Sequence, residues 1–298
     1  MVVNQPDQPD QPDCLGQFGQ FVGTNRAEFG SRLTAVSSAA NEDSPSVRRT
    51  GRGELGLALA FQLGAFVLAT LAITPFVRST GELKPGISGV LVGLAAAWPV
   101  LAVGVVVAAR RRGVSWQRFV GATSVRFADL GMLVVGIALQ FGVGFVYYLA
   151  GTDDRKVSAP ARELTDRTGG LGLTFAVLAV FVVIGAPIFE ELFYRGLVLN
   201  AFRRAFGADG SECSVGPGVD RVASLVGVTP GVVASVAMSS LWFGLIHFQL
   251  LQLLALVFVG LACAVARLKT GRISTSICLH AGFNLATMVA LASQLANK

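Results

Sequence analysis

Charged residues are scarce in this sequence, and their scarcity excludes the ordinary soluble folds. Only 14% of the 298 residues are Asp, Glu, Lys or Arg, whereas 53% are hydrophobic and the mean hydropathy is +0.62. A typical soluble domain has about 25% charged residues. A water-soluble globule is therefore excluded, and so is a chain that is disordered throughout, because its hydrophobicity is too high.

Cysteine and histidine are also rare. The four cysteines (Cys14, Cys213, Cys263 and Cys278) are too few and too scattered for a disulfide scaffold, and none forms a CxxC pair. The net charge of +6 could indicate a nucleic-acid partner, but the arginines lie beside apolar segments, as topology signals do. The expected partner is thus a lipid bilayer and not nucleic acid.

Long apolar stretches separate the few charged segments. A helix needs about 20 residues to cross about 30 Å of hydrocarbon. Seven stretches approach or exceed this length: 55–77, 87–109, 130–150, 171–200, 230–248, 250–268 and 273–295. We therefore predict an all-α, polytopic transmembrane helical bundle of about seven spans. The number becomes eight if Pro187 splits the fourth span or if the amphipathic stretch 113–129 forms a helix at the membrane interface.

The N-terminal segment differs in composition from the rest of the chain. Residues 1–50 are polar and contain three copies of the tripeptide QPD between Gln5 and Asp13. We expect a disordered tail over 1–50 and a transmembrane domain over 51–298. Basic residues before the first span and after the second predict a cytoplasmic N-terminus for a multi-pass protein of the plasma membrane.

The fourth apolar stretch contains ionisable residues that are costly in a membrane. Glu190, Glu191 and Arg195 lie in the run IFEELFYR, and an ionised side chain in mid-membrane costs about 2.5 to 3.5 kcal/mol. Glu191 and Arg195 are four residues apart, so we predict an ion pair on one helix face. Glu190 is turned about 100° away, which leaves its carboxylate available for proton chemistry.

The two histidines of the chain, His247 and His280, both lie in apolar stretches. His247 follows Phe243 by four residues, and Asn284 follows His280 by four, so each pair shares a helix face. Counting about 1.5 Å per residue from the cytoplasmic ends places Glu190 about 21 Å deep but His280 only about 10 Å deep. A shared site therefore requires that the last helix begin below the surface, that helices tilt, or that a boundary be moved.

This set of side chains indicates hydrolysis by an activated water. Glu190, with or without His247, would take a proton from water, while His280 and Asn284 would stabilise the oxyanion. An alternative places one zinc ion on Glu190, His247 and His280, with Glu191 as the base. The chain has no HExxH motif, and the metal-free version, with no cofactor, is preferred. A buried polar cluster that only fixes helix packing remains an alternative.

The three motifs resemble those of the CPBP family of intramembrane proteases, which groups CAAX prenyl proteases of the Ras-converting type with bacteriocin-processing (Abi-type) proteins. The motifs are EExxxR at Glu190–Arg195, FxxxH ending at His247 and HxxxN starting at His280. The resemblance covers about 171–295. It implies that the six motif residues line a polar cavity in the bilayer: Glu190, Glu191, Arg195, His247, His280 and Asn284.

The resemblance also implies a function. The expected activity is that of an intramembrane endopeptidase acting on a membrane-associated peptide or protein, of the CaaX or bacteriocin-like type. Two alternatives from other classes remain open. The first is a catalytically silent membrane scaffold or immunity factor with the same fold, and the second is a transporter that uses its Glu and His groups as a proton relay.

Overall fold

The structure is a computed structural model, and it describes residues 45–80, 86–208 and 229–297. The described chain is helical apart from turns, connections and one isolated β-bridge. The helices before residue 170 are α2 (Pro45–Thr80), α3 (Ile87–Arg111), α4 (Trp116–Val120), α5 (Phe127–Leu149), α6 (Asp154–Val157) and α7 (Ala159–Asp166). After residue 170 the chain contains α8 (Leu173–Val180), η1 (Phe181–Gly185), α9 (Ala186–Phe193), η2 (Tyr194–Val198), α10 (Leu199–Ala205), α12 (Pro230–Leu245), η3 (Leu250–Gln252), α13 (Leu253–Thr270) and α14 (Ile273–Ala296).

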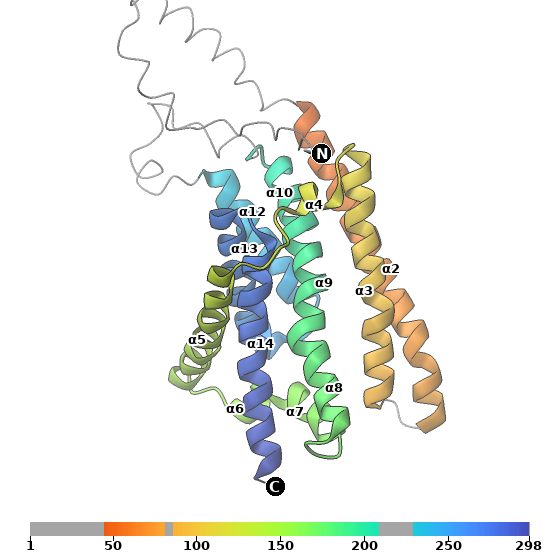
Figure 1. Cartoon of the computed structure of the whole chain (residues 1–298), viewed down its shortest axis with the longest axis vertical. Helices are drawn as coiled ribbons and strands as arrows, with labels where there is room; N and C mark the ends of the chain where they lie inside the picture. Colours follow the sequence, from red (N-terminus) through yellow and green to blue (C-terminus); the bar gives the residue numbers. More distant parts are fainter. Residues whose placement is uncertain (1–44, 81–85, 209–228, 298) are drawn as a thin grey trace, which may run out of the picture. The chain divides into compact units, whose positions relative to one another are not determined.

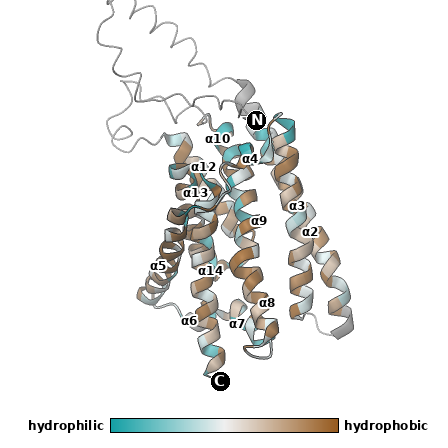
Figure 2. Ribbon diagram, in the orientation of Figure 1, coloured by the Kyte–Doolittle hydropathy of each residue, from teal (hydrophilic) through white to brown (hydrophobic). Residues whose placement is uncertain are grey.

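Six of the described helical segments are long and apolar enough to cross a membrane: 50–77, 87–111, 127–149, 173–205, 250–270 and 273–296. Many of their outward-facing side chains are large and apolar, such as Phe141 at 72% exposure and Val134 at 66%. Hydrophobic residues occupy most of the length of these helices (Figure 2). Such continuous exposed apolar surface is unfavourable in water and favourable in lipid. The prediction of a polytopic transmembrane bundle is confirmed.

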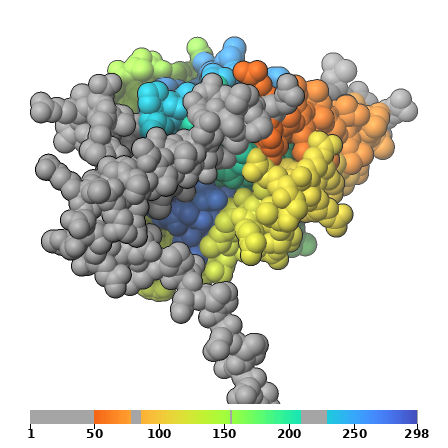
Figure 3. All heavy atoms as spheres, turned by 90° about the horizontal axis from the view of Figure 1, so that it is seen from above, coloured from red at the N-terminus to blue at the C-terminus, as the bar shows by residue number. Residues whose placement is uncertain are grey.

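The segment 173–205 is the central helix of the bundle. It contacts α3 and α14 through α9, and α2 and α12 through η2 and α10 (Figure 1). Every residue from Phe193 to Arg204 is buried, so this part of the helix is surrounded by protein on all sides. Seen along the helices, α2 and α3 lie side by side at one edge (Figure 3). The EExxxR motif therefore lies in the protein interior and not on the lipid face.

Pro187 does not split the fourth span, because a π-helical turn precedes it. The π turn η1 ends at Gly185, and the N–H of the next residue, Ala186, donates to the carbonyl of Phe181, five residues back. A proline within a helix has no N–H to donate and its ring crowds the preceding turn. The wider π turn accommodates both effects. A second π turn, η2, follows directly after α9, so the two glutamates lie between two π turns.

A short helix is present in the stretch 113–129, as predicted: α4 ends at Val120 and is capped by Gly121, which has φ +87°. The chain then runs extended beside the start of α14, where Ala122 forms a β-bridge with Arg272. Two sequence-based boundaries are wrong. The predicted span 230–248 is the 16-residue helix α12, which ends at Leu245. Most of the predicted tail 1–50 lies outside the described residues, but its last six residues belong to α2.

Candidate active site

Glu191 is the centre of a buried polar cluster. Its side chain is 0% exposed and makes an ion pair with Arg195, with 3.1 Å between Oε2 and Nε. The other carboxylate oxygen, Oε1, lies 2.9 Å from Nδ1 of His280. Arg195 also donates to the carbonyl of Gly260, 3.0 Å away, and its guanidinium lies 4.8 Å from the ring centre of Phe243. The predicted ion pair between Glu191 and Arg195 is confirmed.

Because Nδ1 of His280 faces a carboxylate, the hydrogen bond fixes the ring. A neutral imidazole in this position carries its proton on Nδ1 and donates it to Glu191, which leaves the Nε2 lone pair free. Such a carboxylate–histidine pair sets the tautomer and the orientation of the ring. The geometry therefore assigns Glu191 to holding His280 rather than to contact with a substrate.

Glu190 is the more accessible of the two carboxylates. Its side chain is 18% exposed, and its Oε2 lies 3.9 Å from Nε2 of His280. This separation is too long for a direct hydrogen bond. A separation of this size is one that a single water molecule can bridge by contacting both atoms. The expectation that Glu190 is the carboxylate without a close ionic partner agrees with the geometry.

His247 lies in the turn after α12, away from the two glutamates. Its Nδ1 is 2.7 Å from the carbonyl oxygen of Phe243. The ring of Phe243 is 4.9 Å from the ring of His247 and 5.6 Å from the ring of His280, centre to centre. Phe243 therefore contacts both imidazoles, and an aromatic ring links the FxxxH motif to the EExxxR and HxxxN motifs.

Asn284 contacts the first π turn. Its Nδ2 donates to the carbonyl of Val182 over 2.8 Å. In an α-helix this carbonyl would accept from Ala186, but that N–H donates to Phe181 instead, so the π turn frees the carbonyl. The amide of Asn284 thus joins the last helix to the turn that precedes the glutamates, and one of its two N–H groups remains for another acceptor.

The three residues of the zinc alternative do not form a ligand set. Glu190 and His280 approach each other, whereas His247 contacts Phe243 through its Nδ1 and its ring. Among the described residues, no group of three or more His, Cys, Asp or Glu side chains is arranged to hold a metal ion. The geometry therefore gives no support for a zinc site at Glu190, His247 and His280.

The sequence reasoning missed another buried carboxylate. Asp129, the third residue of α5, is 4% exposed and accepts hydrogen bonds from Ser274 and Thr275 at the start of α14. The predicted third span starts at residue 130, three residues after the observed start of α5 at Phe127, and so leaves Asp129 out. The available signal was a single acidic residue at the start of an apolar stretch, together with the hydroxyl pair that follows Arg272.

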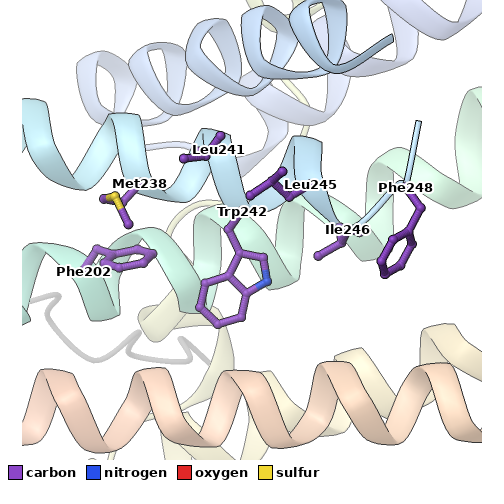
Figure 4. A pocket seen from close by; sticks show the side chains of 7 residues that line it. All are labelled: Phe202, Met238, Leu241, Trp242, Leu245, Ile246 and Phe248. Atoms are coloured by element: carbon purple, nitrogen blue, oxygen red, sulfur yellow. The ribbon is translucent and has the colours of Figure 1, made fainter. Parts of the chain in front are cut away.

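An apolar pocket lies beside the FxxxH motif. Its volume is about 350 Å³, within the range of ligand pockets, and Trp242 lies at its centre between α10 and α12 (Figure 4). Ile246 and Phe248, on either side of His247 in the chain, also line it. Phe248 has a left-handed backbone, with φ +54°, and its ring lies 5.7 Å from that of Phe66 on α2. The pocket wall is therefore continuous with the turn that contains His247.

Comparison with known families identifies the C-terminal part of the chain. Residues 172–286 match the family described as type II CAAX prenyl endopeptidase Rce1-like. Comparison with curated proteins and with solved structures gave no match. The match includes all six motif residues and begins where the central helix begins, which confirms the resemblance to the CPBP and CAAX protease group. Residues 172–286 of this membrane protein are thus similar to the Rce1-like domain of type II CAAX prenyl endopeptidases.

Proposed function

We propose that the protein is an intramembrane endopeptidase that hydrolyses a peptide bond of a membrane-associated substrate. The observation that carries this proposal is the arrangement of two acceptors around one point: Oε2 of Glu190 and Nε2 of His280 lie 3.9 Å apart. Glu191 and Arg195 stabilise this arrangement, because Glu191 accepts a hydrogen bond from Nδ1 of His280 and Arg195 compensates the charge of Glu191.

The mechanism that we propose starts with a water molecule between these two acceptors. A water oxygen about 2.8 Å from both atoms donates one hydrogen to each, so its lone pair is free to attack a carbonyl carbon. As the carbon–oxygen bond forms, Glu190 takes one proton. When the carbon–nitrogen bond breaks, Glu190 gives that proton to the leaving amine. One water is consumed, and a carboxylic acid and an amine are released.

The negative oxygen of the tetrahedral intermediate needs hydrogen-bond donors. We assign this role to the second N–H of the Asn284 amide. A preorganised donor of this kind contributes about 2.7 to 4 kcal/mol in acyl-transfer enzymes. His247 donates Nδ1–H to the carbonyl of Phe243, which leaves Nε2 of the neutral ring as an acceptor. No metal is needed in this scheme, and a chelator should leave the cleavage rate unchanged.

The substrate that we propose is a peptide with an attached apolar chain, of the CaaX type. The apolar pocket beside His247 offers a place for such a chain, and the family is described by prenylated CAAX substrates. We also propose a cytoplasmic N-terminus in the plasma membrane. The end of the bundle that contains the ends of α3 and α13 has exposed Arg110, Arg111, Arg118 and Lys269, as the positive-inside rule requires.

The proposal is tested by cleavage of prenylated and unprenylated CaaX peptides in detergent micelles. Wild-type protein should release the C-terminal tripeptide, and Glu190→Gln should reduce the rate by at least about 100-fold, because it removes the base. Glu163, which pairs with Arg167 on α7, provides a control, since Glu163→Gln should keep the full cleavage rate. Equal rates for wild type and Glu190→Gln would refute the role of Glu190.

Further experiments on the protein and its variants distinguish the alternative functions. A cellular phenotype that the double variant Glu190→Ala, His280→Ala restores fully would favour a silent scaffold or immunity factor. Proton-coupled flux in proteoliposomes, without peptide cleavage, would favour a transporter. Loss of cleavage after chelation, with recovery on addition of Zn²⁺, would favour the zinc-dependent version.

A further inference from the structure

The N-terminal end of α14 is buried and is held by one carboxylate from outside the family-matched segment 172–286. Arg272 is 8% exposed, and Ile273 and Ser274 are each 0% exposed. Asp129 accepts from Ser274 Oγ at 2.8 Å and from Thr275 Oγ1 at 2.9 Å. It also forms an ion pair with Nη2 of Arg272 at 3.1 Å. The last helix therefore begins inside the protein.

The same carboxylate also caps its own helix. Oδ2 of Asp129 accepts from the backbone N–H of Arg126 at 2.8 Å, at the start of α5. A carboxylate at a helix N-terminus is favourable because the helix dipole is positive there. Since Asp129 binds the first turns of both α5 and α14, it fixes the starts of two helices relative to each other.

Close backbone contacts keep the two helices in register beyond this point. A Cβ atom on Gly136 of α5 would lie 1.9 Å from the carbonyl oxygen of Leu279, and a Cβ atom on Gly282 of α14 would lie 2.1 Å from that of Leu133. His280 lies between Leu279 and Gly282 in the sequence. The α5 backbone therefore supports α14 at the height of the imidazole.

The distance along α14 from the residues that Asp129 binds to the imidazole of His280 is short. Thr275 precedes His280 by five residues, which corresponds to about 7.5 Å of rigid helix. A shift of α14 by one residue would move His280 by about 1.5 Å along the axis. Such a shift would break the 2.9 Å hydrogen bond between His280 and Glu191.

We propose that Asp129 is a positioning residue that sets the axial position of α14 so that His280 meets Glu191. The inference rests on the proposed function for its catalytic consequence, but its structural part can be measured separately. Asp129 lies before the family-matched segment 172–286, whereas Arg272, Ser274 and Thr275 lie within it. The N-terminal half of the chain thus supplies a residue that the catalytic arrangement depends on.

The direct test uses the fact that the chain contains only two histidines. In a His247→Asn background, ¹⁵N-histidine labelling gives one imidazole, His280, whose Nδ1–H signal reports its hydrogen bond to Glu191. Asp129→Asn should shift or broaden this signal strongly. The milder double variant Ser274→Ala, Thr275→Val keeps the charge of Asp129 and should give a smaller change in the same direction.

Glu54→Gln is the matched control. Glu54 is also buried and pairs with two arginines, Arg112 and Arg204, but it joins α2 to α3 and α10 and does not touch α14. Its substitution should leave the His280 signal unchanged. An unchanged signal in folded Asp129→Asn protein would overturn the proposal, and so would an equal change in Glu54→Gln. If Asp129→Asn does not fold, the double variant decides by the same criterion.

The kinetic test compares peptide cleavage by Asp129→Asn and by wild type, with His247 and His280 both present. A misplaced His280 should lower kcat by about 10- to 100-fold while KM for the peptide stays within about twofold, because the damage is to the chemical step and not to substrate contacts. A raised KM with unchanged kcat would overturn the positioning role. If the imidazole signal changes as expected but the wild-type protein cleaves no peptide, the proposed function fails and the positioning inference stands.

Discussion

Replacing Glu191 by glutamine should destabilise the protein strongly, whereas the same change at the adjacent Glu190 should not. Glu191 is 0% exposed and neutralises Arg195, which is 1% exposed. The glutamine variant leaves the guanidinium in the interior with the carbonyl of Gly260 and the ring of Phe243 as its remaining partners. An uncompensated buried charge costs about 3 to 5 kcal/mol of unfolding free energy.

Two other carboxylates set the scale of this effect. Glu190 is 18% exposed and its nearest ionic contact, to His280, is 3.9 Å long, so Glu190→Gln should cost less than about 1 kcal/mol. Glu163 makes an i, i+4 pair with Arg167 at 2.9 Å, but its side chain is 47% exposed. Glu163→Gln should cost less than about 0.5 kcal/mol, because solvent screens an exposed pair.

The assay is reversible unfolding in mixed micelles of increasing SDS content, followed by tryptophan fluorescence. All three variants are compared with wild type at one temperature and one lipid composition. The reasoning would be refuted if Glu191→Gln unfolded within about 1 kcal/mol of wild type, or if Glu190→Gln were the less stable of the two adjacent variants.

Two further predictions concern packing and substrate binding. Gly136→Ala should lower the unfolding free energy by more than about 2 kcal/mol in the same micelle assay, because its Cβ would overlap the carbonyl of Leu279. Gly131→Ala is the control and should be neutral, because the space around Gly131 is open. Equal unfolding free energies for the two variants would contradict the close contact between α5 and α14. Trp242→Ala should raise KM for a prenylated peptide by about 10-fold or more and leave KM for the unprenylated peptide unchanged. The reason is that the indole ring contributes apolar contact area only when an apolar chain binds in the pocket. An equal rise in KM for both peptides would show that the pocket does not recognise the substrate.

Features that depend on neighbouring residues in the chain were predictable. The ion pair between Glu191 and Arg195 follows from a spacing of four residues on a helix, and the structure contains it. The six long spans follow from composition in windows of about 20 residues. Pro187 is only partly informative: it indicates a disturbed helix, and the structure shows that the helix continues through a π turn, with the ring of Trp98 close to Gly185.

Features that depend on how helices pack could not be read from the sequence. The burial of the start of α14 is one such feature: Ile273 is 0% exposed, and nothing in the sequence indicates that the last helix begins inside the protein. His247 was expected on the same helix as Phe243, but α12 ends at Leu245. The sequence contains no signal for the distance between Glu190 and His280, which are ninety residues apart.

The sequence by itself determined that the protein is a membrane-spanning helical bundle and that its rare ionisable residues form three motifs, because hydropathy and helical spacing are properties of short segments. The tertiary structure decided which of those residues meet. It placed Glu191 against His280, left Glu190 facing the same imidazole across 3.9 Å, and fixed α14 through Asp129. These contacts join segments that are far apart in the chain, so only the packing of the helices determines them.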